Sequence, residues 1–102
     1  SFDPVIRYAR LGNTGAIAGV TLGEGSLLIE NALIKLFDGP ELIGTTFSEN
    51  DGEFGFIGIE PGTYQLTVEK EGLEKDTLET EVEIQSETNI SFRLDSTAVA
   101  NN

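Results

Sequence analysis

The chain has 102 residues, and its composition already excludes several classes of protein. This length suits one domain with a single core and is too short for two. Cysteine and histidine are absent, which excludes disulfides, thiolate or imidazole zinc sites and a Ser-His-Asp triad. The net charge is −12, so nucleic acids and anionic membranes would repel the chain. No apolar run approaches the roughly 20 residues of a membrane span.

The chain contains 12 glycines, and they separate short runs that are either apolar or alternate between apolar and polar residues. This spacing is typical of an all-β sandwich or barrel, and helical periodicity is hard to find. Seven strands are predicted, at Ala16–Leu22, Ala32–Phe37, Ile43–Ser48, Glu53–Ile57, Thr63–Lys70, Leu78–Gln85 and Thr88–Asp95.

Alternation of apolar and polar residues predicts which side chains face the core. It is clearest in the fifth strand, where Tyr64, Leu66 and Val68 alternate with polar residues, as in a half-buried strand. The core-facing residues expected elsewhere are Ala32, Ile34 and Leu36, Phe54 and Phe56, Leu78, Val82 and Ile84, and Ile90, Phe92 and Leu94. Seven such strands bury their apolar faces best as two packed sheets. We therefore predict an all-β, seven-stranded antiparallel β-sandwich.

The sequence divides into three parts. Residues 15–95 form the predicted sandwich, and residues 96–102 are small and polar, as in a tail that frays. Residues 1–14 form an arm that reads as strand-like and carries two arginines. This arm is either an added edge strand or the end of a preceding domain. Because the chain begins with Ser1 and contains no methionine, we interpret it as a piece of a longer protein.

Several motifs together carry a resemblance to a known family. They are Gly15, Ile17 and Gly19; Ala32, Ile34 and Leu36; Ser48, Glu49, Gly52 and Phe54; Pro61, Gly62 and Tyr64; and Lys70 with Gly72. The pattern resembles the carboxypeptidase regulatory-like domain family, whose prealbumin-like (transthyretin-like) sandwich is shared with collagen-adhesin B-type repeats. The match spans residues 15–95. Every matched residue is a packing or turn residue, so the resemblance implies a fold and almost no chemistry.

Two further comparisons follow from that resemblance. Pro4–Arg7 looks like the end of an uncharacterised domain of certain bacterial surface lipoproteins, in which a module of the present type comes next. Collagen-adhesin B-type repeats often carry a Lys–Asn isopeptide crosslink from the first strand to the last. Asn89 is available, but the first predicted strand has no lysine, and Lys35 lies on the second. We expect no crosslink.

The acidic hairpin at residues 48–53 is the one candidate metal site. Its carboxylates, Glu49, Asp51 and Glu53, are hard oxygen ligands of the kind that calcium prefers. The loop lacks the EF-hand spacing and its distal bidentate glutamate. A polar β-turn is the favoured interpretation, because Asn50, Asp51 and Gly52 tolerate unusual backbone angles. We predict no cofactor.

Clustered apolar residues mark candidate interfaces. Leu27, Leu28 and Ile29 are consecutive. We expect one of the three side chains to be buried at the end of the core and the other two to remain exposed. With Val5, Ile6 and Tyr8 nearby in the sequence, a junction with a neighbouring domain is the expected interface. Tyr8 and Phe47 are the candidate sugar-stacking aromatics. The acidic run from Glu69 to Glu87 is interpreted as a solvated edge strand, protected by charge from edge-to-edge pairing.

These patterns favour a binding or structural role over catalysis, because outward carboxylates in water keep ordinary pKa values and make poor acids. The leading hypothesis is a non-catalytic module of a larger bacterial cell-surface or secreted protein, acting as a spacer, stalk or docking domain with its termini placed for serial linkage. The alternative is a carbohydrate- or protein-binding module acting through its loops. A role as a peptidase accessory rests on the family name alone.

Overall fold

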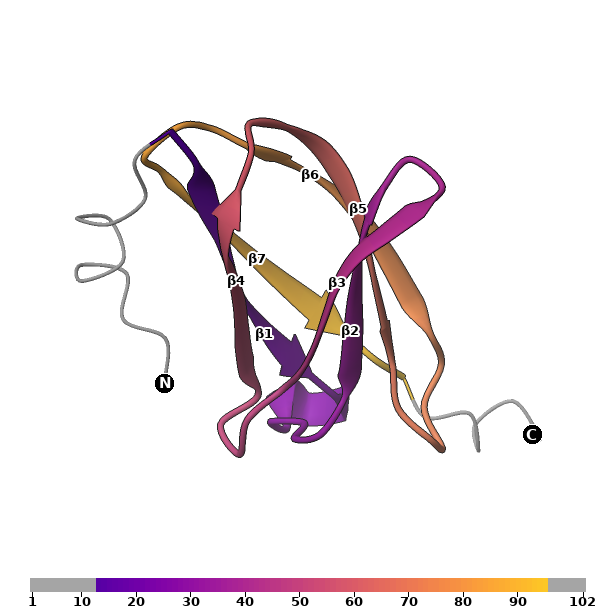
Figure 1. The fold of residues 1–102 in the computed structure, drawn as a ribbon. Helices are drawn as coiled ribbons and strands as arrows, with labels where there is room; N and C mark the ends of the chain where they lie inside the picture. Colours follow the sequence, from indigo (N-terminus) through magenta and orange to yellow (C-terminus); the bar gives the residue numbers. More distant parts are fainter. Residues whose placement is uncertain (1–12, 96–102) are drawn as a thin grey trace.

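The computed structural model describes residues 13–95, which form two packed β-sheets (Figure 1). One sheet has the order β4-β1-β7 and the other the order β3-β2-β5-β6. The elements are β1 (Gly15–Leu22), the 3₁₀-helix η1 (Glu24–Ser26), β2 (Leu33–Asp38), β3 (Glu41–Phe47), β4 (Glu53–Ile59), β5 (Gly62–Glu69), β6 (Asp76–Val82) and β7 (Glu87–Arg93). Every predicted strand is present, and the predicted all-β sandwich is confirmed. No helix among residues 13–95 is long and apolar enough to cross a membrane.

The core lies between the sheets and is built from the alternating residues that the sequence predicts. Ile34 and Leu36 of β2 pair with Val68 and Leu66 of β5 in an antiparallel ladder, and all four are fully buried. From the other sheet, the core receives chiefly Ile17, Phe54, Phe56 and Phe92. Burying one such side chain stabilises the fold by about 1.5–3 kcal/mol, which is why the period-two pattern sets the register.

One strand pair departs from the expected antiparallel order. β1 and β7 run parallel, in register from Ala16 beside Glu87 to Leu22 beside Arg93. Parallel neighbours need a crossover connection, and here the connection is all the rest of the domain. The first and last strands therefore point the same way, so the chain enters at one end of the sandwich and leaves at the other (Figure 1).

The prediction for the end of β6 is wrong. The strand ends at Val82, and Ile84, expected in the core, is 54% exposed. The backbone turns at Gln85, which has a positive φ of 51°, to cross to the other sheet. The edge position predicted for this acidic segment is confirmed, because β6 borders the four-stranded sheet and its Glu79 and Glu81 are exposed.

Two buried hydroxyl groups fix the loops at the end of the sandwich where β1 finishes. The Ser48 hydroxyl accepts a hydrogen bond from the Ala32 N–H at 2.9 Å and donates to the Ile29 carbonyl at 2.8 Å. The Thr21 hydroxyl also donates to the Ile29 carbonyl, at 2.7 Å. Because buried polar groups need partners, these bonds hold the segment around Ile29 against the core.

Candidate functional site

The acidic hairpin is organised as a turn. The Asp51 carboxylate accepts a hydrogen bond from the Glu53 N–H at 3.0 Å, and the Gly52 N–H donates to the Glu49 carbonyl at 2.8 Å. Gly52 has φ +80°, and a Cβ there would lie 2.7 Å from the Thr21 carbonyl oxygen, so only glycine fits. Among residues 13–95, no group of three or more acidic side chains is placed to hold a metal ion. The calcium hypothesis for Glu49, Asp51 and Glu53 thus gains no support.

The segment Leu27–Ile29 divides as the sequence predicts. Ile29 is buried and belongs to the core cluster, whereas Leu27 and Leu28 are 66% and 51% exposed. Phe47 is also exposed and precedes Ser48, whose hydroxyl bonds to the Ile29 carbonyl. We name Leu27, Leu28 and Phe47 the end patch. The other members of the predicted junction, Val5, Ile6 and Tyr8, lie outside the described residues, so the junction stays a prediction.

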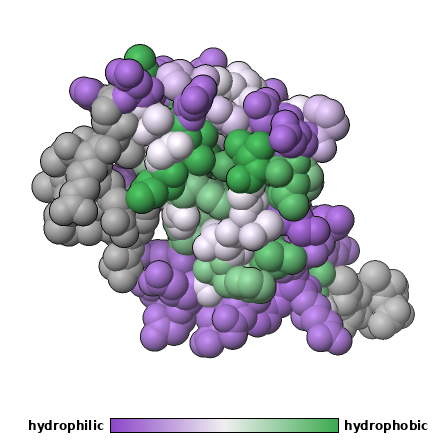
Figure 2. Space-filling view, in the orientation of Figure 1, coloured by the Kyte–Doolittle hydropathy of each residue, from purple (hydrophilic) through white to green (hydrophobic). Residues whose placement is uncertain are grey.

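Further apolar surface lies along the side of the sandwich where β3 and β4 are the free sheet edges. Leu42 and Ile43 of β3 and Ile57 of β4 are each about half exposed. Figure 2 shows apolar side chains gathered on this face, with hydrophilic side chains around them. Both strands present apolar side chains to solvent here.

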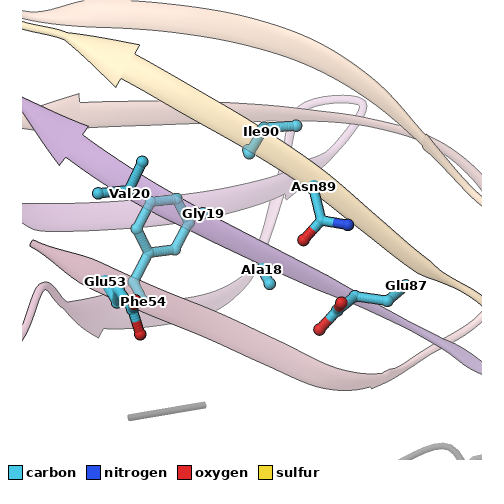
Figure 3. A pocket seen from close by; sticks show the side chains of 8 residues that line it. All are labelled: Ala18, Gly19, Val20, Glu53, Phe54, Glu87, Asn89 and Ile90. Carbon is cyan, nitrogen blue, oxygen red and sulfur yellow. The ribbon is translucent and has the colours of Figure 1, made fainter. Parts of the chain in front are cut away.

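An open groove crosses the outer face of the three-stranded sheet and holds the most unusual polar group of the domain. Ala18 and Val20 of β1 form its floor, Glu53 of β4 lines it on one side, and Glu87 and Asn89 of β7 line it on the other (Figure 3). Its volume is about 350 Å³.

Glu87 is the unusual group. One of its carboxylate oxygens, Oε2, is buried without a hydrogen-bond partner. Burial raises the pKa of the Glu87 carboxyl above its ordinary value, and a hydrogen bond with Asn89 partly offsets that rise. A carboxylate held in this way attracts a hydrogen-bond donor or a cation.

Sequence reasoning missed this groove. In the sequence, Glu87 is one more acidic residue in the run from Glu69 to Glu87, and nothing in the alternation indicates that one of its carboxylate oxygens is buried. The sequence contained one indication of the groove. Ala16, Ala18 and Val20 alternate on β1 with residues of the core face, and such small side chains on an outward face leave a depression between the larger side chains of the neighbouring strands.

A family model matches the chain over residues 16–95, with the description "Carboxypeptidase regulatory-like domain". The chain belongs to the carboxypeptidase regulatory-like domain family. The match covers nearly all the described residues, and the resemblance noted in the sequence is confirmed. No curated protein sequence matches the chain.

Solved structures share this fold at low sequence identity. The Bacillus anthracis TIE protein matches with a TM-score of 0.72 and 12% identity, over 82% of this chain and 17% of that protein. The minor pilin GBS52 of Streptococcus agalactiae matches with a TM-score of 0.70 and 11% identity, over 85% of this chain and 46% of that one. The chain therefore spans less than half the length of either.

The fold also occurs in an enzyme. The 5-hydroxyisourate hydrolase of Klebsiella pneumoniae has a TM-score of 0.66 and 14% identity, over 80% of this chain and 85% of that one. At such identities the likeness shows the fold alone. Several of the similar structures are pilin or pilus proteins rather than enzymes, and the family match fits a non-catalytic module.

Proposed function

We propose that this domain is a non-catalytic spacer in a larger bacterial cell-surface or secreted protein, and that it carries tension along its length. The observation that carries the proposal is the parallel pairing of β1 and β7. Neighbouring domains of the same polypeptide, joined before residue 13 and after residue 95, are its expected partners. We include in the proposal that the larger protein is a bacterial surface lipoprotein, because Pro4–Arg7 resembles the end of a domain found in such proteins.

The physical argument concerns how force would enter the fold. Tension on the two chain ends pulls β1 and β7 in opposite directions along their common axis. The ladder between them, seven residue pairs from Ala16–Glu87 to Leu22–Arg93, is then loaded in shear. In a parallel ladder the hydrogen bonds are evenly spaced, so all of them share the load and must fail together. Antiparallel terminal strands would place both ends at one end of the sandwich and open one bond at a time.

Features on either side of this ladder strengthen it. β1 is the central strand of its sheet, with β4 on its other side, and it contributes the fully buried Ile17 to the core. On β7, the Leu94 N–H donates to the Leu22 carbonyl at 2.7 Å just beyond the ladder. Phe92 of β7 packs against the Phe54 ring, with centroids 6.1 Å apart.

A tandem chain of identical modules, pulled from its ends by optical tweezers, tests the spacer function. We expect each module to resist and then unfold in one cooperative step. Each step should release about 270 Å, since residues 13–95 extend to roughly 3.6 Å apiece and the folded strands already span about 26 Å. Smooth lengthening at low force, without discrete steps, would contradict a tension-bearing role.

The end patch supports a second candidate function, the binding of a glycan or protein through the loops. Leu27, Leu28 and Phe47 place three large exposed apolar side chains at one end of the sandwich, and exposed apolar clusters mark interaction sites. A glycan array separates the two functions. A spacer yields no hits, whereas a lectin-like module yields related glycans whose binding Phe47→Ala weakens.

A further inference from the structure

The outer face of the β4-β1-β7 sheet is covered by no other layer of the described residues. It is formed by the outward residues of β1, namely Ala16, Ala18 and Val20, with Glu53 on β4 and Glu87 on β7. The floor of small side chains is therefore flanked by an acidic residue on each neighbouring strand. A surface of this shape suits an extended segment that has both apolar and cationic side chains.

Two details show that this face is not an ordinary solvated surface. Ala16 is only 1% exposed, although it points away from the core-facing Ile17 beside it. The Glu87 oxygen Oε2 is buried and has no hydrogen-bond partner among residues 13–95. None of the four basic side chains in these residues lines the groove. The groove thus lacks the cation that its carboxylate would attract.

The segment that precedes β1 has the complementary chemistry. Residues 1–12 contain Val5, Ile6, Tyr8 and Leu11 together with Arg7 and Arg10. They hold 2 of the 6 basic and 1 of the 18 acidic side chains, so residues 1–12 have a charge of 2 − 1 = +1 and residues 13–95 a charge of 4 − 17 = −13. Opposite charge steers the segment to the acidic face, and an arginine fork pairs well with a carboxylate.

Residues 1–12 are also long enough to extend along the whole of β1. Twelve extended residues span about 40 Å, whereas the 8 residues of β1 span about 26 Å. The chain turns at the exposed Asn13 just before β1 begins. A reversal at this point would place the segment over the face of the strand that it precedes.

We propose that residues 1–12 dock on the outer face of the β4-β1-β7 sheet, with apolar side chains on Ala18 and Val20 and an arginine against Glu87. The docked segment forms a third layer and shields the groove from solvent. A docked segment would carry the entering chain back along β1 towards the end where β7 leaves. Tension on the chain would therefore peel the segment from the face before it loads the β1–β7 ladder, and the docking is tested separately from the spacer function.

Paramagnetic relaxation measured by NMR on the full chain tests the docking. The chain has no cysteine, so Ala9→Cys, and separately Ser1→Cys, takes a single nitroxide label. For the Ala9→Cys label we expect the amide signals of Ala18, Val20 and Asn89 to be lost while those of β5 and β6 persist. The Ser1→Cys label should broaden signals of the same sheet at other positions along the strands.

A matched pair of charge variants tests the contact with Glu87. Glu87→Gln should at least halve the broadening from the Ala9→Cys label, whereas Glu79→Gln, the same charge change on the exposed edge of β6, should leave it unchanged. Absence of broadening, or broadening centred on β3, would overturn the proposal. So would broadening that appears on unlabelled copies mixed with labelled ones, because that result assigns the face to a second copy of the chain.

Discussion

Tyr64 shows how a single side chain links a turn to the core. It is 7% exposed at the start of β5, and its hydroxyl donates to the Glu60 carbonyl at 2.6 Å. The ring packs in the core cluster, while the hydroxyl closes the turn at Pro61 and Gly62. Burial, followed by the charges of Asp38 and Glu60, raises the pKa of Tyr64 above its ordinary value of about 10.

We predict distinct costs for two substitutions of Tyr64. Tyr64→Ala should lower the free energy of unfolding by about 3–5 kcal/mol, and Tyr64→Phe by about 1 kcal/mol, since it removes one hydrogen bond. The raised pKa means that the folded state favours the neutral phenol. The corresponding stability is complete below pH of about 10 and is lost as the pH rises through the folded-state pKa.

Urea unfolding at neutral and alkaline pH measures both effects. Wild type should lose more stability than Tyr64→Phe above pH of about 10. A Tyr64→Ala variant as stable as wild type would mean that the side chain is not buried. Identical alkaline behaviour of wild type and Tyr64→Phe would show that the phenol does not carry the effect.

At the scale of elements, β1 and β4 are fitted together by a glycine and a ring. Gly19 pairs with Phe54 across the ladder, and a Cβ at Gly19 would lie 2.3 Å from the ring of Phe54. That ring also meets Phe56 edge-on, with centroids 6.4 Å apart. Any side chain at position 19 must therefore displace Phe54 from the centre of the core.

A double-mutant cycle tests this fit. Gly19→Ala should destabilise the domain by about 1–3 kcal/mol through overpacking. Combined with Phe54→Leu, it should cost less than the sum of the two single changes, because the smaller side chain makes room. The control is Gly25→Ala, at a φ of +66° with open space around it. It should cost about 1–2 kcal/mol from backbone strain and add to Phe54→Leu. Additivity in both pairs would refute the contact.

The elements also show what a sequence pattern can and cannot determine. All seven strands and most core residues follow from period-two alternation and from glycine and proline turns, because burial of one face leaves few registers. The partner and direction of a strand do not follow, since Ala16–Leu22 has the same alternation beside a parallel or an antiparallel neighbour. Ile84 was misplaced because alternation continues past the residue where the backbone turns. The groove at Glu87 depends on strand order as well, so the small outward residues of β1 do not locate it by themselves.

For the whole molecule, the parallel first and last strands decide how the domain connects to its neighbours. β1 begins beside β7, where the Gln85 N–H donates to the Thr14 carbonyl at 2.8 Å, and β7 ends beside the end of β1 at Leu22 and Arg93. A chain of such domains extends by the length of each sandwich. Force applied along that chain acts on the β1–β7 ladder in shear in every domain.

The most direct measurement of this claim compares two pulling axes in the same domain. Cysteines introduced at Asn13 and Asp95 apply force along the natural axis and load the ladder in shear. Cysteines at Asn13 and Gln85, which lie together at the start of both strands, open the same ladder from one end. We predict that the domain unfolds at a several-fold higher force along the natural axis at equal loading rate. Equal forces on the two axes would contradict a ladder that bears tension.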